Sequence, residues 1–273
     1  GENVFPEQHL WGARDYFKAD YYKNNAAHFV SETGYHGCPC LSSLKKTVSE
    51  DALWPIFNEQ WSLHSSDQHG GMGRVELMYK QVRQLFGEAP RSLDDFILAS
   101  QISQAEAMKY FVERIRVKKP RTGGVIWWNL LDGWPQMSDA VVDYFFEKKL
   151  AYRYLKASGA PFAMIVDEMR DWHYDVRVCN DTLSNRRGEY TISDILTGEV
   201  LASGGYEAEA NGNRVVARLS MMYSDKRMLL LTWTDESGER GRNHYLCGMP
   251  PFDLGTYRTW LDLLTGAEKT TTE

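Results

Sequence analysis

Residues 28–34 (HFVSETG) constrain the fold of this chain more than any other stretch. Two apolar residues, Phe29 and Val30, lead through a serine to the carboxylate of Glu32, and Gly34 follows two positions later. This pattern predicts a short buried strand that ends by presenting Glu32. We expect the chain to turn directly afterwards, because glycine adopts a positive φ without steric cost. On its own, a glutamate before a turn is usually structural.

A second strand-like stretch, residues 124–135 (GVIWWNLLDGWP), also runs from apolar residues into aromatic and acidic ones. A helical region separates the two stretches. Strands joined by helices are parallel, with crossover connections. A carboxylate and a tryptophan at the same ends of neighbouring parallel strands form a common layout in barrel enzymes that cleave glycosidic bonds.

Apolar residues at helical spacing predict the intervening helices. A helix is expected over residues 74–86, where Gly87 ends it, and a longer one starts at Ser92 and ends before Pro120. Shorter helices are predicted over residues 44–47, 50–57 and 147–157. The first part of the chain therefore has the strand–helix order of an α/β domain.

The pattern changes at residues 159–161, and we place a domain boundary there, between 1–159 and 160–273. Downstream, alternation of apolar and polar residues replaces helical spacing. Turn residues separate the alternating segments at 180–181, 197–198, 211–213 and 236–238. Several short strands at that spacing predict an antiparallel β-sandwich. The polar tail from Glu268 is expected to fray.

Composition excludes several classes of protein. The 273 residues include 43% hydrophobic and 25% charged residues, which is typical of globular proteins and not of disordered ones. No apolar run approaches the ~20 residues that a membrane helix needs. The net charge of −6 gives no electrostatic reason to expect a nucleic-acid partner. The four cysteines are expected to be free thiols, so the redox compartment stays open.

Aromatic residues are numerous, with nine tryptophans and fifteen tyrosines. Flat aromatic faces stack on the apolar faces of sugar rings, although most of these side chains are expected in the core. The chain begins Gly-Glu-Asn, without a start methionine or a leader. We expect it to be a piece of a longer protein, so absent targeting signals do not report its location.

Four further short motifs are His9-x-Trp11-Gly12 and residues 100–105, 142–144 and 149–152. Together with residues 29–34 and 124–135, they resemble the β-mannosidase-like branch of glycoside hydrolase family 2, which also contains β-galactosidases and β-glucuronidases. The stretch 29–34 looks like the family's nucleophile motif, and residues 100–105 look like the helix before its last barrel strand. The resemblance covers residues 9–160.

The resemblance implies a multi-domain α/β plus β fold. Residues 1–159 would be the C-terminal part of a (β/α)8 TIM barrel, and 160–273 an immunoglobulin-like antiparallel β-sandwich. The activity implied is that of a retaining exo-β-glycosidase, with β-mannosides favoured as substrates. β-Galactosidase, β-glucuronidase and exo-glucosaminidase specificities stay open. A non-catalytic carbohydrate-binding or structural module is the alternative from another class.

By the same resemblance, Glu32 is the catalytic nucleophile. Trp127 would be the platform on which the sugar stacks, and Trp128 would point away from it by strand alternation. The acid/base glutamate would lie upstream of this chain, because Asn58-Glu59 has the right dipeptide but follows the nucleophile. The other candidate substrate-binding residues are Trp11, His9, Tyr35 and Asp132.

The resemblance implies no cofactor and no metal ion. The partners expected are a carbohydrate substrate (a β-glycoside) and upstream domains of the same polypeptide, with no nucleic acid and no membrane. A secreted or periplasmic location is favoured. We expect the isolated chain to be inactive and to associate, because a barrel without its other strands leaves unpaired edges and apolar surface exposed.

Overall fold

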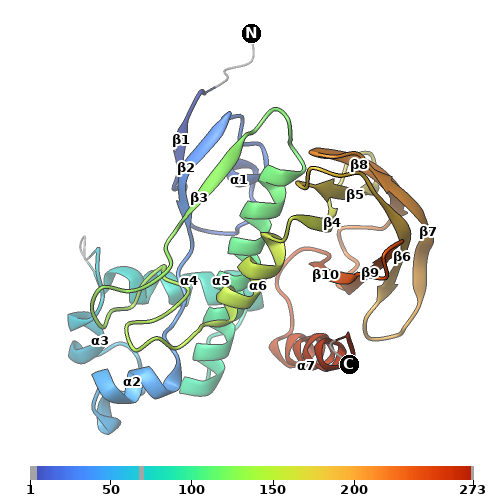
Figure 1. Ribbon diagram of the computed structural model, residues 1–273. Coiled ribbons are helices and arrows are strands. Elements are labelled where there is room, and N and C mark those ends of the chain that lie inside the picture. The colour runs from blue at the N-terminus through green and yellow to red at the C-terminus, as the bar shows by residue number, and fades with distance from the viewer. Residues whose placement is uncertain (1–4, 68–70, 272–273) are drawn as a thin grey trace. The chain divides into compact units, whose positions relative to one another are not determined.

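The computed structural model describes residues 5–67 and 71–271 of the chain (Figure 1). These residues form two compact units. The first comprises the residues up to Val112 together with Thr122–Ala157, and the second comprises Glu113–Arg121 and the residues from Ser158 onward.

The first unit is built on a three-stranded sheet, with the order β1 (Gln8–Leu10), β2 (Phe29–Gly34), β3 (Gly124–Trp128). All strands are parallel, as predicted. Ahead of β3, the Gly123 N–H donates to the carbonyl of His28 at 2.7 Å. That bond aligns β3 with β2 from their first residues.

The middle strand carries a β-bulge at its functional residues. Gln8 of β1 pairs with Val30, but the next residue, His9, pairs with Glu32. The pairing with β3 shows the same one-residue offset between Val30 and Thr33. β2 therefore contains one extra residue at Ser31–Glu32, and bulges of this kind redirect side chains at barrel rims and active sites.

The two faces of this sheet differ in exposure. Val30 and Thr33 are fully buried on one face. The opposite face is open, and its large apolar side chains are Phe29 (38% exposed), Ile126 (55%) and Trp128 (44%).

Helices and short turns account for most of the rest of the first unit. Their bounds are α1 (Asp20–Lys23), α2 (Leu41–Thr47), the 3-10 turn Glu50–Ala52, α3 (Glu59–Leu63), α4 (Gly73–Phe86), α5 (Leu93–Arg116) and α6 (Leu150–Ser158). The helix expected over 50–57 is only one turn, because Pro55 has no N–H to donate. Asn58 caps α3 by accepting bonds from the Gln60 and Trp61 N–H groups, so Asn58-Glu59 is the start of a helix.

Helix α5 runs alongside the sheet (Figure 1) and holds the loops that follow β2 and β3. Its Ser100 hydroxyl accepts a bond from the Cys38 N–H at 3.0 Å. Its fully buried Gln104 amide donates to the carbonyls of Tyr35 at 3.0 Å and Asp139 at 2.8 Å. Buried polar groups need partners, so these side chains set the geometry of both loops.

The second unit contains two antiparallel sheets. Their orders are β10-β9-β6-β7 and β4-β5-β8. The strand bounds are β4 (Phe162–Val166), β5 (His173–Asn180), β6 (Arg186–Asp194), β7 (Val200–Ala208), β8 (Gly212–Ser220), β9 (Met228–Asp235) and β10 (Arg240–Leu246). The predicted alternating segments are confirmed as β5, β6, β8 and β9.

One apolar core lies between these sheets, because inward side chains from both meet in a single cluster. Fully buried examples are Met164, Val176 and Val178 from one sheet, and Ile192, Leu229 and Leu231 from the other. This packing agrees with the expected antiparallel architecture of the second half.

The final helix, α7 (Leu254–Thr271), was not predicted from the sequence. Its signal was present, since Tyr257, Trp260 and Leu264 are buried at helical spacing. Asp253 caps it by accepting a bond from the Thr256 N–H at 2.6 Å. The tail expected to fray is helical up to Thr271, and residues 272–273 lie outside the described residues. Within the described ranges, no helix has the length and apolar character needed to cross a bilayer.

Gly188 of β6 provides a test of the sheet packing. A Cβ there would lie 2.1 Å from the Thr234 carbonyl oxygen, a backbone atom of the neighbouring strand. We expect Gly188→Ala to lower the free energy of unfolding by about 2 kcal/mol, measured by urea denaturation. The control is Gly266→Ala, where a Cβ meets nothing within 4 Å and alanine favours the helix. Equal stability of the two variants would contradict the described register.

Candidate active site

Glu32 lies at the bulge of β2 on the open face of the sheet, and its side chain is 26% exposed. The indole Nε1 of Trp11 donates a hydrogen bond to its Oε1 atom at 2.6 Å. The Nδ1 atom of His9 is 4.0 Å from the same oxygen. Both groups contact Oε1, which leaves Oε2 as the oxygen that neither of them holds.

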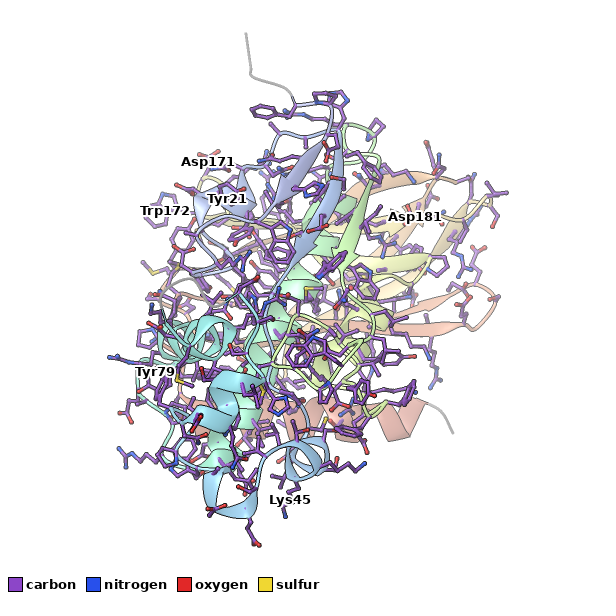
Figure 2. All side chains as sticks on the ribbon, turned by 90° about the vertical axis from the view of Figure 1, so that its left-hand side faces the viewer. Tyr21, Lys45, Tyr79, Asp171, Trp172 and Asp181 are labelled. Atoms are coloured by element: carbon purple, nitrogen blue, oxygen red, sulfur yellow. The ribbon has the colours of Figure 1, made fainter. Side chains whose placement is uncertain are left out.

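Gly34 is required by close packing rather than by a turn. The strand continues to Gly34, whose φ is not positive, so the expected turn at this glycine is wrong. A Cβ at this position would lie 2.5 Å from Trp11 Cη2 and 2.5 Å from the Trp128 carbonyl oxygen. The missing side chain therefore lets the Trp11 ring approach the strand beside Glu32. The ring of Tyr21, labelled in Figure 2, covers Gly12 in the same way, 2.3 Å from where a Cβ would lie.

A second carboxylate, not singled out from the sequence, lies beside His9. The Glu7 Oε1 atom is 3.8 Å from His9 Nε2 and accepts a hydrogen bond from the Ser31 hydroxyl. The side chains of His9 and Glu7 are 60% and 54% exposed, so both are accessible from solvent. The structure thus brings His9 and Trp11 to Glu32, as the hypothesis about the site requires.

The two tryptophans of β3 exchange the places expected for them. Trp127 pairs with Thr33, which is fully buried on the face opposite Glu32. Trp128 pairs with Gly34 and is 44% exposed on the open face. The two tryptophans point to opposite faces, as strand alternation predicts. The bulge in β2 decides which of them lies on the same face as Glu32. The hypothesis of a stacking platform therefore moves from Trp127 to Trp128.

Tyr35 is not available to a substrate in this structure. Its side chain is 1% exposed, and its hydroxyl donates to the carbonyl of Asp15. Its ring packs edge-on against Phe17 and Phe111, with centroids 6.2 Å apart in each pair. Burial raises the pKa of the Tyr35 hydroxyl well above its ordinary value. The expected substrate contact is replaced by a role in the core.

Asp132 is also buried, at 3% exposure, so it does not present oxygens to a sugar. Its carboxylate accepts hydrogen bonds from Gln136 at 2.9 Å and from the Ser138 hydroxyl. Burial raises the pKa of Asp132, and the positive charge of Lys149 opposes that shift. Asp132 therefore fixes the loop that follows β3.

The sequence did not predict a series of linked ion pairs that the structure contains. His36 Nε2 lies 2.9 Å from Asp139 Oδ1, and both side chains are fully buried. Arg74 pairs with Asp139 and also with Asp67, the latter at 2.9 Å. Burial disfavours the charged form of Asp139, but His36 and then Arg74 outweigh it and hold its pKa below the ordinary value. These residues are far apart in the sequence, so no spacing signals them.

In the part of the chain that the structure describes, no three His, Cys, Asp or Glu residues are grouped so that they could hold a metal ion. All four cysteines are free thiols, as predicted.

No protein-family model matches the chain. In sequence, it is 31% identical over 147 residues to the β-mannosidase of Mus musculus, covering 50% of this chain and 16% of that protein. It is 29% identical over 133 residues to an exo-β-D-glucosaminidase of Arthroderma benhamiae, covering 46% of this chain and 15% of that protein. The chain therefore spans about a sixth of the length of the curated relatives it matches.

In structure, the chain is similar to a β-D-mannosidase from Dictyoglomus thermophilum, with a TM-score of 0.76 and 22% identity. The match covers 90% of this chain and 30% of that protein, and it shows the fold. Together with the sequence matches, it supports the resemblance described above. In sequence and in fold, the chain is similar to segments of β-mannosidases.

Gly34→Ala tests the packing around Glu32. The added methyl group needs the space that the Trp11 ring occupies, so we expect the ring to move and its bond to Glu32 to break. A crystal structure of the variant should place Trp11 Nε1 beyond about 3.5 Å from Glu32 Oε1. Gly133→Ala is the control, because a Cβ there meets nothing within 4 Å. An intact bond in the Gly34 variant would contradict the geometry described.

Proposed function

We propose that this chain forms part of a retaining exo-β-glycosidase that acts on terminal β-linked sugars, with Glu32 as the nucleophile. The observation that carries the proposal is the position and orientation of the Glu32 carboxylate. It stands on the open face of the sheet, and Trp11 holds one of its two oxygens at 2.6 Å. A nucleophile needs such an oriented carboxylate with a free oxygen.

In the proposed first step, Glu32 Oε2 attacks the anomeric carbon and the bond to the leaving-group oxygen breaks. A carboxylic acid from outside this chain protonates that oxygen. In the second step, the same acid/base group takes a proton from water, whose oxygen attacks the anomeric carbon and releases Glu32. Two inversions give net retention, and no cofactor is required.

The proposed architecture follows from the same resemblance. Three parallel strands connected through helices support assignment of the first unit to the C-terminal part of a (β/α)8 barrel. Two antiparallel sheets around one core support an immunoglobulin-like sandwich for the second unit. Domains of the same polypeptide would then supply the other barrel strands and the acid/base.

β-Mannosides are the proposed substrates, since a β-mannosidase is among the relatives matched in sequence and another is matched in fold. A terminal glucosaminide is the second candidate, favoured by the matched exo-β-D-glucosaminidase. A non-catalytic carbohydrate-binding module is disfavoured by the Trp11–Glu32 bond, because a stacking surface alone needs no oriented carboxylate.

Chemical rescue of a Glu32 variant tests the proposal. In the full-length protein, Glu32→Ala should lower kcat on an aryl β-mannoside by at least about four orders of magnitude. Added azide should restore turnover by attacking the face that Glu32 has vacated, and the product should be the α-mannosyl azide. The anomeric configuration, read by NMR, distinguishes a missing nucleophile from a missing acid/base, which would give the β-azide.

Glu59→Ala is the control, because Glu59 starts helix α3 in the dipeptide rejected as the acid/base. It should retain wild-type turnover. Turnover that survives Glu32→Ala without azide would refute the assignment of the nucleophile.

Trp128→Ala and Trp127→Ala separate the two faces of β3. Loss of a stacking aromatic should raise KM for the aryl β-mannoside about tenfold in the Trp128 variant. The Trp127 variant should keep its KM and lose about 2 kcal/mol of stability, because Trp127 is half-buried beside Thr33 on the other face of the sheet. Steady-state kinetics and denaturant unfolding of both variants check this. A raised KM in the Trp127 variant and an unchanged KM in the Trp128 variant would support Trp127 as the stacking residue instead.

A further inference from the structure

Arg14 contacts the aromatic ring that holds Glu32. Its guanidinium carbon lies 4.7 Å from the centroid of the Trp11 ring, within the range of a cation–π interaction. The Trp11 ring is fixed on another side by Gly34, through the close approach of Cη2 to that residue. Arg14 and Gly34 therefore restrict the ring whose N–H reaches Glu32.

The backbone of Arg14 adopts a conformation that non-glycine residues avoid. Its φ is 56°, in the left-handed region. The Arg14 N–H donates to the Tyr22 hydroxyl at 3.2 Å, and the Gln81 amide donates to the Arg14 carbonyl at 2.9 Å. Tyr22 and Gln81 are each 2% exposed, so two buried side chains impose this backbone. Conformations maintained in this way are concentrated at functional sites.

The charge of Arg14 is also anchored. Its Nη1 atom is 4.0 Å from Asp67 Oδ2, the same oxygen that Arg74 contacts at 2.9 Å. Arg74 continues to the fully buried Asp139, which pairs with His36. The guanidinium over Trp11 is thus the outer end of a chain of ion pairs that begins in the core.

We propose that Arg14 is a positioning residue for the nucleophile, holding the Trp11 indole N–H on Glu32 Oε1 so that Oε2 faces the anomeric carbon. The inference rests on the proposed function. A cation over the ring attracts the indole and polarises its N–H, which strengthens donation to the carboxylate. Without it, the ring has contacts on fewer sides and the carboxylate loses its fixed orientation.

A double-mutant cycle on the full-length protein tests this coupling. Trp11→Phe removes the donor and should lower kcat/KM on an aryl β-mannoside about thirtyfold. Arg14→Met keeps an unbranched apolar stem, removes the charged guanidinium and should lower kcat/KM about tenfold. If Arg14 acts through Trp11, the double variant should lose about thirtyfold, not the product of the two effects. Multiplicative losses would overturn the proposal.

Two further variants separate positioning from folding. Arg14→Gly removes the side chain but suits a positive φ, so it should lose activity like Arg14→Met while its melting temperature is unchanged or higher. Arg14→Lys retains a cation and should recover most of the activity. Arg91→Met, at an 86% exposed arginine of the same unit, is the matched control and should be neutral.

The outcomes distinguish failure of the role proposed for Arg14 from failure of the proposed glycosidase function. Turnover that is absent from the wild-type protein, or independent of Glu32, would refute the proposed function. Turnover that depends on Glu32 but changes less than twofold in Arg14→Met and Arg14→Gly would refute the role of Arg14 alone.

Discussion

The hydrogen bond from Trp11 to Glu32 depends on a constraint in the backbone, the extra residue in β2. Without the bulge at Ser31–Glu32, strand alternation would continue and the side chains after Val30 would exchange faces. With the bulge, Glu32 stands on the open face and pairs with His9 of the neighbouring strand β1. Its Oε1 atom is then 2.6 Å from the indole nitrogen of Trp11. The chemistry proposed for this chain therefore rests on one irregular strand.

Buried polar contacts hold the loops that follow β2 and β3. Ser100 and Gln104 of α5 bond the backbone after β2, and Gln104 also bonds the loop after β3. Lys149, fully buried, donates to the carbonyl of Gly37 at 2.8 Å. Each of these groups is costly to bury without a partner, so the loops have little freedom to adopt another arrangement.

Much of this arrangement is predictable from local pattern, and the rest depends on contacts distant in sequence. Apolar runs and helical spacing predict β2, β3, α4 and α5, and the motif at Glu32 points to the site. The face of Trp128 was missed because the bulge sets it. Tyr35 and Asp132 were expected to contact the substrate. In the structure, the Tyr35 hydroxyl donates to the Asp15 carbonyl, and the Asp132 carboxylate accepts from the Ser138 hydroxyl. The buried pair of His36 and Asp139 spans 103 positions of the chain, which no short-range pattern encodes.

Covalent trapping tests the account most directly. The full-length protein would be incubated with a 2-fluoro β-mannosyl reagent carrying a good leaving group, digested, and the labelled peptide sequenced by mass spectrometry. The account predicts a 2-fluoromannosyl ester on Glu32, because the slowed second step preserves the glycosyl-enzyme intermediate. A label on a different carboxylate would contradict it. So would no label from manno- or gluco-configured reagents, together with full hydrolytic activity in Glu32→Gln.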